Sequence, residues 1–270
     1  MAVLVLTVLM GSCSLSSSSG HSDYHHFFVE EELPLLTEFE GSPYCDFSVD
    51  FTSLNETDSI ASLINETILT EFLGKDFAHL SPDAAVDSFK IDYWREYQKE
   101  CGKIYRMEMQ EATSVDEIPA WFSQTYSLVT FVEEGRGGII NATANYYVDM
   151  GGAHPSQWGR WLNFDFMTGK LLGKEDVFHA DTQKDIENLL LQKLILQQAE
   201  VHPDEEVKTL EDLQKLGLLQ MTNMYIPDNF LLSKNAMLFL YNRYDIAPYA
   251  AGEIVIEVPY EEIGHYLKIN

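Results

Sequence analysis

The residues best suited to chemistry lie in one glycine-rich loop, residues 151–155, which reads Gly-Gly-Ala-His-Pro. Paired glycines are costly inside a strand, so this run marks a turn with a special backbone conformation. The imidazole of His154 can serve as a general base or as a ligand, with Asp149 or Asp165 orienting it. Alternatively, the ring hydrogen-bonds locally and holds the turn. We favour this structural role, because a catalytic site needs several convergent groups.

No established catalytic signature accompanies this loop. The sequence has no G-x-S-x-G, no H-E-x-x-H, no phosphate-binding P-loop and no C-x-x-C. Its many carboxylates allow no choice of one catalytic pair. His21, His25 and His26 stand beside Asp23 and can hold a metal weakly, but a solvated linker over residues 21–42 explains them better. We therefore predict no catalytic residue beyond these weak candidates, no metal site and no cofactor.

The same loop and the strand after it offer a candidate binding patch. Exposed Trp and Arg side chains are typical anchors of protein interfaces, and aromatic rings can equally stack on sugars. The alternative places both tryptophans in the core. The predicted binding residues are Gly151, Gly152, His154, Gln157, Trp158, Arg160 and Trp161.

The charge of the chain restricts its partners. With 43 Asp and Glu against 17 Lys and Arg, the formal net charge is −26 over 270 residues. Nucleic-acid binding is not expected, because phosphate recognition needs basic side chains. A basic partner would be attracted and its encounter accelerated, although acidity can also serve solubility alone.

The first 20 residues predict an address outside the cytoplasm. A short apolar run leads to Cys13 and a Ser-rich stretch, which resembles a lipoprotein signal followed by a tether. No Lys or Arg precedes the apolar run, which is a departure from that pattern, and a buried N-terminal strand is the alternative. Cys13 is then the lipidated residue, so membrane contact is expected only through the anchor. Cys45 and Cys101 remain as a disulfide pair or as two separately buried thiols.

Hydrophobic periodicity predicts the elements that position the loop. Helices are expected at about 60–72, 81–101, 182–194 and 204–217, with a last helical turn after Pro259. Strands are expected at 45–52, 103–113, 121–133, 138–150, 158–167, 226–232, 236–241 and 253–258. Ala142, Ala144, Tyr146, Val148 and Met150 should share one face. The pattern predicts an α+β fold, with helices packed on antiparallel sheets.

Two stretches of the sequence also resemble a known module. The matching pieces are Gly151–Pro155, Asn163, Asp165, Thr168–Lys170, Glu175–Phe178, Phe230–Leu232, Tyr244, Ala247–Gly252 and Val258–Tyr260. Residues 142–178 and 225–262 are thereby similar to the extracellular domain of the RsiV anti-sigma factor. The same module precedes the catalytic domain of the peptidoglycan deacetylase PdaC, and residues 44–130 resemble the PdaC-type module that often comes before it.

This resemblance implies two linked α+β modules: a PdaC-like module at 43–135 and an RsiV-like module at 136–270. The RsiV domain binds lysozyme, so the expected function is non-catalytic binding of a basic, lysozyme-like muramidase or of cell-wall glycan. The expected place is the bacterial cell envelope, facing the periplasm or the cell exterior. The alternative is a hydrolase of envelope polysaccharide that uses His154 and a nearby carboxylate. The catalytic metal motif of PdaC is absent from the sequence.

Overall fold

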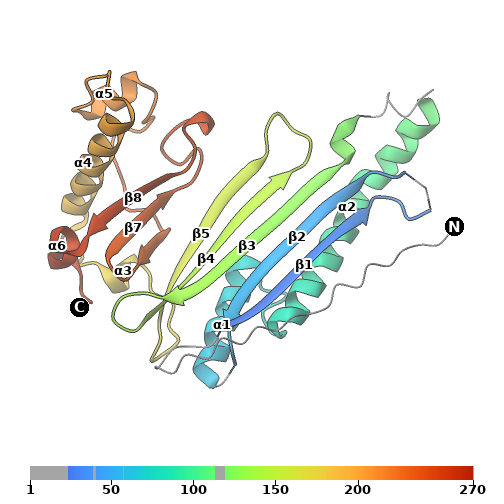
Figure 1. Ribbon diagram of the computed structural model, residues 1–270, viewed down its shortest axis with the longest axis horizontal. Coiled ribbons are helices and arrows are strands. Elements are labelled where there is room, and N and C mark those ends of the chain that lie inside the picture. Colours follow the sequence, from blue (N-terminus) through green and yellow to red (C-terminus); the bar gives the residue numbers. More distant parts are fainter. Residues whose placement is uncertain (1–23, 39–40, 57, 113–118, 270) are drawn as a thin grey trace.

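The computed structural model describes residues 24–38, 41–56, 58–112 and 119–269. Cys13, His21 and Asp23 lie outside these ranges. Two sheets, each with its own helices, stand side by side (Figure 1). The expected α+β class is therefore confirmed.

The first sheet has five strands in the order β1-β2-β3-β4-β5. They are β1 (Tyr24–Pro34), β2 (Tyr44–Leu54), β3 (Gln124–Glu134), β4 (Ile139–Asp149) and β5 (Ser156–Asp165). All neighbours are antiparallel except β2 and β3, which run parallel with Cys45 opposite Gln124. A parallel pair needs a long crossover, and α1 (Ser59–Phe72) and α2 (Pro82–Glu111) supply it.

Both crossover helices pack on the same side of the first sheet (Figure 1). Asp58 caps α1 by accepting hydrogen bonds from the amides of Ile60 and Ala61, and Gly74 follows its end at φ +113°. In β2, Cys45, Phe47, Val49 and Phe51 are buried under the helices, as their alternation predicts. On β4 the same face carries Ala142, Ala144, Tyr146 and Val148, whereas Met150 is exposed.

The strand predicted at 103–113 is wrong, because α2 continues to Glu111. Residues 103–111 are mostly good helix formers, and Tyr105 extends the buried side of the helix that Tyr97 and Cys101 begin. Its ring meets Phe122 edge-on, with 5.1 Å between the ring centroids. This packing stabilises the helix beyond Gly102, a residue that disfavours helix.

The linker predicted at 21–42 is also wrong, since residues 24–34 form β1 at the edge of the sheet. Phe27 and Val29 pack on the first core, whereas Glu30, Glu31 and Glu32 are exposed. An acidic run is typical of a linker, but charged residues also suit an edge strand, where they discourage pairing with other chains. His25 and His26 bond to Asp83 and Asp50. No cluster of three or more potential metal ligands occurs among the described residues.

The second sheet has the order β6-β7-β8, all antiparallel. Its strands are β6 (Phe230–Leu232), β7 (Ala236–Tyr241) and β8 (Ile254–Pro259). The helices of this part are α3 (Lys174–Val177), α4 (Gln183–Val201), α5 (Leu210–Lys215) and α6 (Tyr260–Ile263). Within the described ranges, the 3-10 turns are η2 (Ala120–Phe122), η3 (Tyr249–Ala251) and η4 (Gly264–Tyr266). Helix α4 packs on the second core through Ile186, Leu190 and Leu194.

The two hydrophobic cores do not divide the chain at the predicted boundary. The first core runs from residue 33 to 164, and the second holds Ile139 with residues 177 to 267. The boundary at 135/136 falls between β3 and β4, which are adjacent strands of one sheet. The division between cores therefore lies after β5. Cys45 and Cys101 are both buried and free, which favours separate burial over a disulfide.

Asparagine side chains join the second sheet to the edge of β5. Asn163 donates to the carbonyl of Phe230 and accepts from the amide of Leu232, both at 2.8 Å. Asn229 and Asn242 bond the backbone of Gly159, and Asn229 also accepts from the amide of Trp161 at 3.0 Å. The asparagine side chains thus bond backbone groups of β5 that a neighbouring strand would otherwise pair, so the edge of β5 is covered.

Among the described residues, no helix combines the length and the apolarity that spanning a bilayer requires.

Candidate binding site

The Gly-Gly-Ala-His-Pro loop connects β4 to β5. The carboxylate of Asp149 accepts a hydrogen bond from the amide of Gly151 at 2.9 Å. Gly151 has φ +71°, and a Cβ there would lie 2.3 Å from Cα of Trp121. Gly152 differs: its φ is not in the left-handed region, and the nearest atom to a Cβ would be 3.9 Å away. A backbone conformation that favours glycine is thus confirmed at Gly151. For Gly152 the same prediction is wrong.

His154 joins this loop to the loop between β7 and β8. Its ring stacks on Tyr249, with 3.7 Å between centroids and 18° between planes. Nε2 lies 3.0 Å from the hydroxyl of Tyr244, and Nδ1 lies 3.3 Å from the carbonyl oxygen of Pro155. A carbonyl can only accept, so Nδ1 carries a proton. In the neutral ring Nε2 then accepts from the Tyr244 hydroxyl.

Tyr244 is the most unusual residue of this arrangement. Its φ is +71°, and among the described residues no other non-glycine has a positive φ. The side chain is nevertheless 61% exposed. A tight turn fixes the backbone, since the amide of Asn242 donates to the Asp245 carboxylate at 2.8 Å and the amide of Asp245 donates back to the Asn242 carbonyl. A bulky residue held in this conformation costs stability and commonly marks a functional position.

Arg243 contacts both loops of this arrangement through Gln157 and Tyr249. Its Nη2 donates to the side-chain oxygen of Gln157 and its Nη1 to the carbonyl of Tyr249, both at 2.9 Å. The guanidinium carbon lies 4.6 Å from the centroid of the Tyr249 ring. We call His154, Gln157, Arg243, Tyr244 and Tyr249 the loop cluster. It joins residues about 90 positions apart, and the β4–β5 and β7–β8 loops that carry it both lie along the upper edge of the view in Figure 1.

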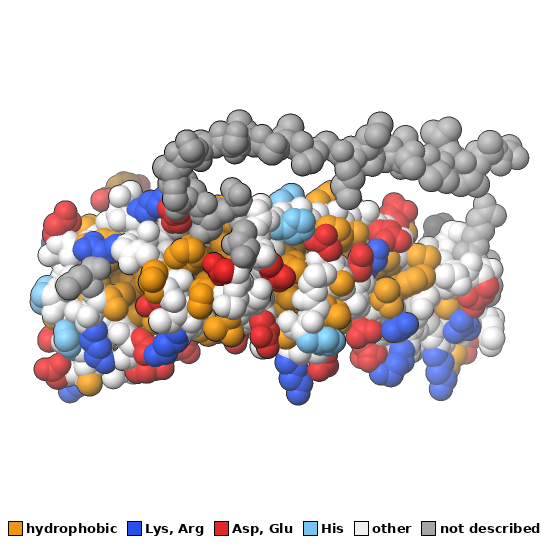
Figure 2. Space-filling model, turned by 90° about the horizontal axis from the view of Figure 1, so that it is seen from below, with side chains coloured by type: hydrophobic (Ala, Val, Ile, Leu, Met, Phe, Trp, Pro, Cys, Tyr) orange, Lys and Arg blue, Asp and Glu red, His pale blue; other side chains and the backbone are white. Residues whose placement is uncertain are grey.

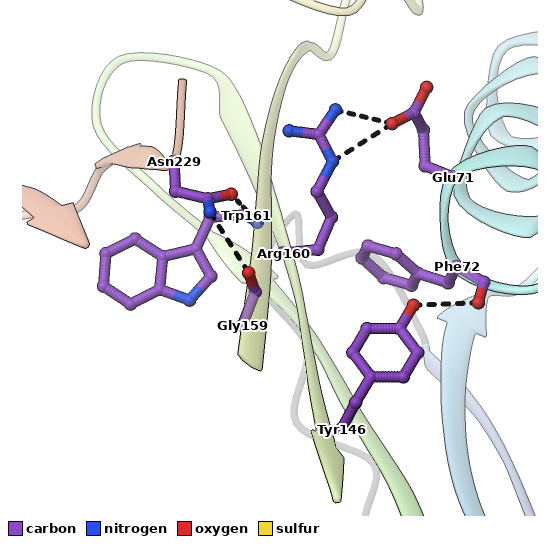
Figure 3. A network of polar contacts seen from close by, with 7 residues as sticks. All are labelled: Glu71, Phe72, Tyr146, Gly159, Arg160, Trp161 and Asn229. Atoms are coloured by element: carbon purple, nitrogen blue, oxygen red, sulfur yellow. Dashed lines mark hydrogen bonds and ion pairs between the residues drawn. The ribbon is translucent and has the colours of Figure 1, made fainter. Parts of the chain in front are cut away.

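Two other predicted residues, Trp158 and Arg160, point to the opposite face of β5 from Gln157. Trp158 stacks on Tyr146, with 4.6 Å between centroids and 6° between planes, and remains 38% exposed. Nη2 of Arg160 donates to Glu71 of α1 at 2.5 Å (Figure 3). Tyr146 donates to the carbonyl of Phe72 at 2.8 Å, and burial raises the pKa of its hydroxyl despite the opposing effect of Arg160.

Trp161 points away from Arg160, toward the second sheet (Figure 3). It is half-buried and lines a cavity of about 300 Å³ together with Leu171 and Asp228. The predicted binding residues therefore do not form one patch. His154 and Gln157 belong to the loop cluster, whereas Trp158, Arg160 and Trp161 lie elsewhere.

The two carboxylates proposed to orient His154 have other partners. Asp165 lies at the far end of β5, a strand of 10 residues, which corresponds to roughly 30 Å. Its carboxylate accepts from the amides of Met167 and Thr168, both at 2.9 Å. Asp149 is bonded to Gly151. The structure therefore does not bring His154, Asp149 and Asp165 together.

The sequence did not predict that Arg243, Tyr244 and Tyr249 belong to the loop cluster. Tyr244 and Tyr249 lie in the motif that carries the resemblance, so that motif was the available signal. Arg243 directly precedes it, but its contacts with Gln157 and Tyr249 depend on the tertiary structure.

The protein is thus of the α+β class. Its two sheets lie side by side, and the loop cluster forms where the β4–β5 and β7–β8 loops touch. Solved structures share this fold. A DUF3298 family member from Bacteroides fragilis NCTC 9343 is similar with a TM-score of 0.82 and 25% identity, over 92% of this chain and 94% of that one. A DUF3298 family protein from Pseudomonas aeruginosa PAO1 has a TM-score of 0.59 at 17% identity, with the same coverage.

The sequence itself contains a domain of this family. The family described as "Protein of unknown function (DUF3298)" matches residues 175–261, which include β6, β7, β8 and the β7–β8 half of the loop cluster. No curated protein matches the chain.

Proposed function

We propose that this chain is a non-catalytic binding protein of the bacterial cell envelope, anchored by lipid at Cys13. Its partner is a basic, lysozyme-like muramidase, and its contact surface is the loop cluster. The observation that carries the proposal is the exposure of Tyr244, which the turn and His154 hold in place. The resemblance to the RsiV extracellular domain favours the same partner.

The loop cluster has the chemistry of an interface anchor. Tyr and Arg are enriched among the residues that dominate binding energy, and a tyrosine loses little side-chain entropy on binding. Tyr244 is already ordered before a partner arrives, because its hydroxyl meets His154 and its backbone is fixed by Asp245. Pre-organisation of this kind lowers the free energy cost of association.

The charge of the chain supports a basic partner. The net charge is −26. Basic side chains are interspersed with acidic ones on the face shown in Figure 2. The attraction of cations therefore comes from the net charge, and salt screens it beyond about 8–10 Å at moderate ionic strength.

The bonding of His154 supports binding over hydrolysis. Its Nε2 meets the Tyr244 hydroxyl, and neither Asp149 nor Asp165 is placed to orient the ring. The ring therefore lacks the carboxylate partner that the hydrolase alternative assigns to it.

An equilibrium titration tests the proposal. The chain should bind a basic lysozyme at low salt, and Tyr244→Ala should weaken this affinity by roughly tenfold or more. Phe131→Ala is the matched control, because this ring on β3 is 56% exposed and lies outside the loop cluster. It should leave the affinity unchanged. Absence of binding to any lysozyme at low salt removes the muramidase, and binding of soluble peptidoglycan fragments instead would assign the surface to glycan.

The lipid anchor is tested separately. Cells labelled with a fatty-acid analogue should carry the label on the wild-type chain and not on Cys13→Ala, which should leave the membrane fraction. An unlabelled, unanchored wild-type chain would contradict the anchor without affecting the binding proposal.

A further inference from the structure

A second surface feature lies apart from the loop cluster, where α2 faces the ends of β3 and β4. A cavity of about 420 Å³ opens here. Its α2 wall is a row at four-residue spacing, which places these side chains along one face of the helix: Phe89, Tyr93, Tyr97 and Cys101. Val148 and Met150 close the sheet side.

The floor of the cavity is aromatic and uncharged. Phe77 meets Phe89 edge-on, with 5.7 Å between centroids, and Tyr93 lies 4.7 Å from Tyr126. The hydroxyl of Tyr97 donates to the carbonyl of Phe122 at 2.5 Å. Burial raises the pKa of both Tyr93 and Tyr97, so the floor stays neutral at physiological pH.

The rim of the cavity is acidic. Asp92, Glu96 and Glu100 form a second row on α2, again at four-residue spacing, and Asp76 adds a fourth carboxylate. The described residues that line the cavity include no Lys, Arg or His. Asp92 and Glu96 form exposed ion pairs with Arg95 and Lys99, which contribute little free energy. Asp76 and Glu100 form no ion pair with a described residue, although Glu100 acts electrostatically on Lys99.

One polar group of the interior lacks a good partner. Gln124 lines the cavity and is 6% exposed. Among the described residues, its side chain makes one hydrogen bond, from Nε2 to the sulfur of Cys101 at 3.6 Å. A thiol is a weak acceptor, and a buried amide normally finds strong partners. The carbonyl oxygen of this amide is therefore available to a ligand's N–H.

We propose that this cavity binds a small organic cation, an ammonium or guanidinium group joined to an apolar body. Its volume lies within the range of about 300–1,000 Å³ that is usual for small-molecule sites. The aromatic floor accepts the apolar body and attracts the cation through the ring faces, and the rim carboxylates pair with its charge. An anion is repelled by the same carboxylates, and a neutral molecule gains nothing from them.

Calorimetric titration of the full chain at low salt tests this site with three probes of one shape: 4-phenylbutylammonium, 4-phenylbutanol and 4-phenylbutyrate. The ammonium should bind, the alcohol should bind about tenfold more weakly, and the carboxylate should show no binding. Equal affinity for ammonium and alcohol would overturn the role of the rim. Putrescine should bind less tightly than 4-phenylbutylammonium, and the reverse order would overturn the role of the aromatic floor.

Variants locate the probe. The double change Asp76→Asn with Glu100→Gln should weaken ammonium binding about fivefold and leave alcohol binding unchanged. Glu108→Gln is the matched control, since Glu108 is an exposed carboxylate of α2 outside the cavity. Met150→Lys, at an exposed position, places a tethered ammonium at the cavity and should abolish probe binding. Unchanged ammonium affinity in both cavity variants, with unaltered thermal unfolding, would overturn the proposal.

Discussion

Gly151 and Gly152 are neighbours, yet a side chain would have different consequences at the two positions. Gly151→Val should lower the free energy of unfolding by roughly 1–3 kcal/mol, because φ is +71° and Trp121 leaves no room. Gly152→Ala should change it by less than about 0.5 kcal/mol. Urea unfolding of both variants gives the comparison, and equal losses would contradict this description of the loop.

Tyr244 allows strain to be separated from function. Asn tolerates the left-handed region better than Tyr. Tyr244→Asn should therefore leave the free energy of unfolding unchanged or raise it by up to about 1 kcal/mol, while binding of the basic partner is lost. Thermal unfolding and titration of one sample measure both. A clear loss of stability with intact binding would show that the tyrosine is structural.

For individual residues, the sequence predicted which residues occupy the loop better than it predicted which residues they contact. The structural role favoured for His154 agrees with its bonds to Pro155 and Tyr244. The φ of Tyr244 had no sequence signal, because it is imposed by a turn that Asp245 closes. Trp158 and Arg160 were grouped with Gln157 by nearness in sequence, although alternate residues of a strand face opposite sides.

Among the elements, the junction between β5 and β6 depends most on one side chain. Asn163 is 2% exposed and bonds the backbone of Phe230 and Leu232. Asn163→Ala should lower the free energy of unfolding by roughly 2–4 kcal/mol, since it leaves buried backbone groups without partners. Asn145→Ala, at an exposed position of β4, is the control and should have little effect. Similar losses in urea unfolding would remove this role.

The packing of α2 on β2 protects two thiols. Burial raises the pKa of Cys45 to about 12, and burial also raises the pKa of Cys101. Cys45, which does not line the cavity beside α2, should not react with iodoacetamide in the native chain at pH 8. Both thiols should react in denaturant without a reductant, as mass spectrometry would show. A raised thiol pKa stabilises the fold below the unfolded value near 8.5, and this contribution declines as pH rises toward the folded value. Absence of labelling in denaturant would instead indicate a disulfide.

Periodicity predicted most strands and helices because one face of each is buried. It failed at residues 103–113, where Tyr105, Met107 and Met109 alternate as in a strand but belong to the helix that packs on Phe122. It failed again at β1, whose acidic residues resemble a linker. Both errors concern segments whose structure is decided by a distant partner, β2 for β1 and Phe122 for the end of α2.

For the whole molecule, two cores and an asparagine-bonded junction hold two distant loops together, and the sequence did not predict that division. The predicted boundary at 135/136 followed the family resemblance, whereas strand pairing continues across it to β5. The arrangement matters for function because each loop supplies only part of the loop cluster. His154 and Gln157 come from one side of the junction, and Arg243, Tyr244 and Tyr249 come from the other.

The dissociation rate of a basic lysozyme from the immobilised chain tests the central claim, that the loop cluster anchors a basic partner. Tyr244→Ala should accelerate dissociation by roughly tenfold or more, whereas Phe131→Ala should not change it. In the wild-type chain, raising the salt concentration should mainly slow association, since long-range attraction is screened while the packed centre of the interface is not. Equal dissociation rates for wild type and Tyr244→Ala would contradict the account.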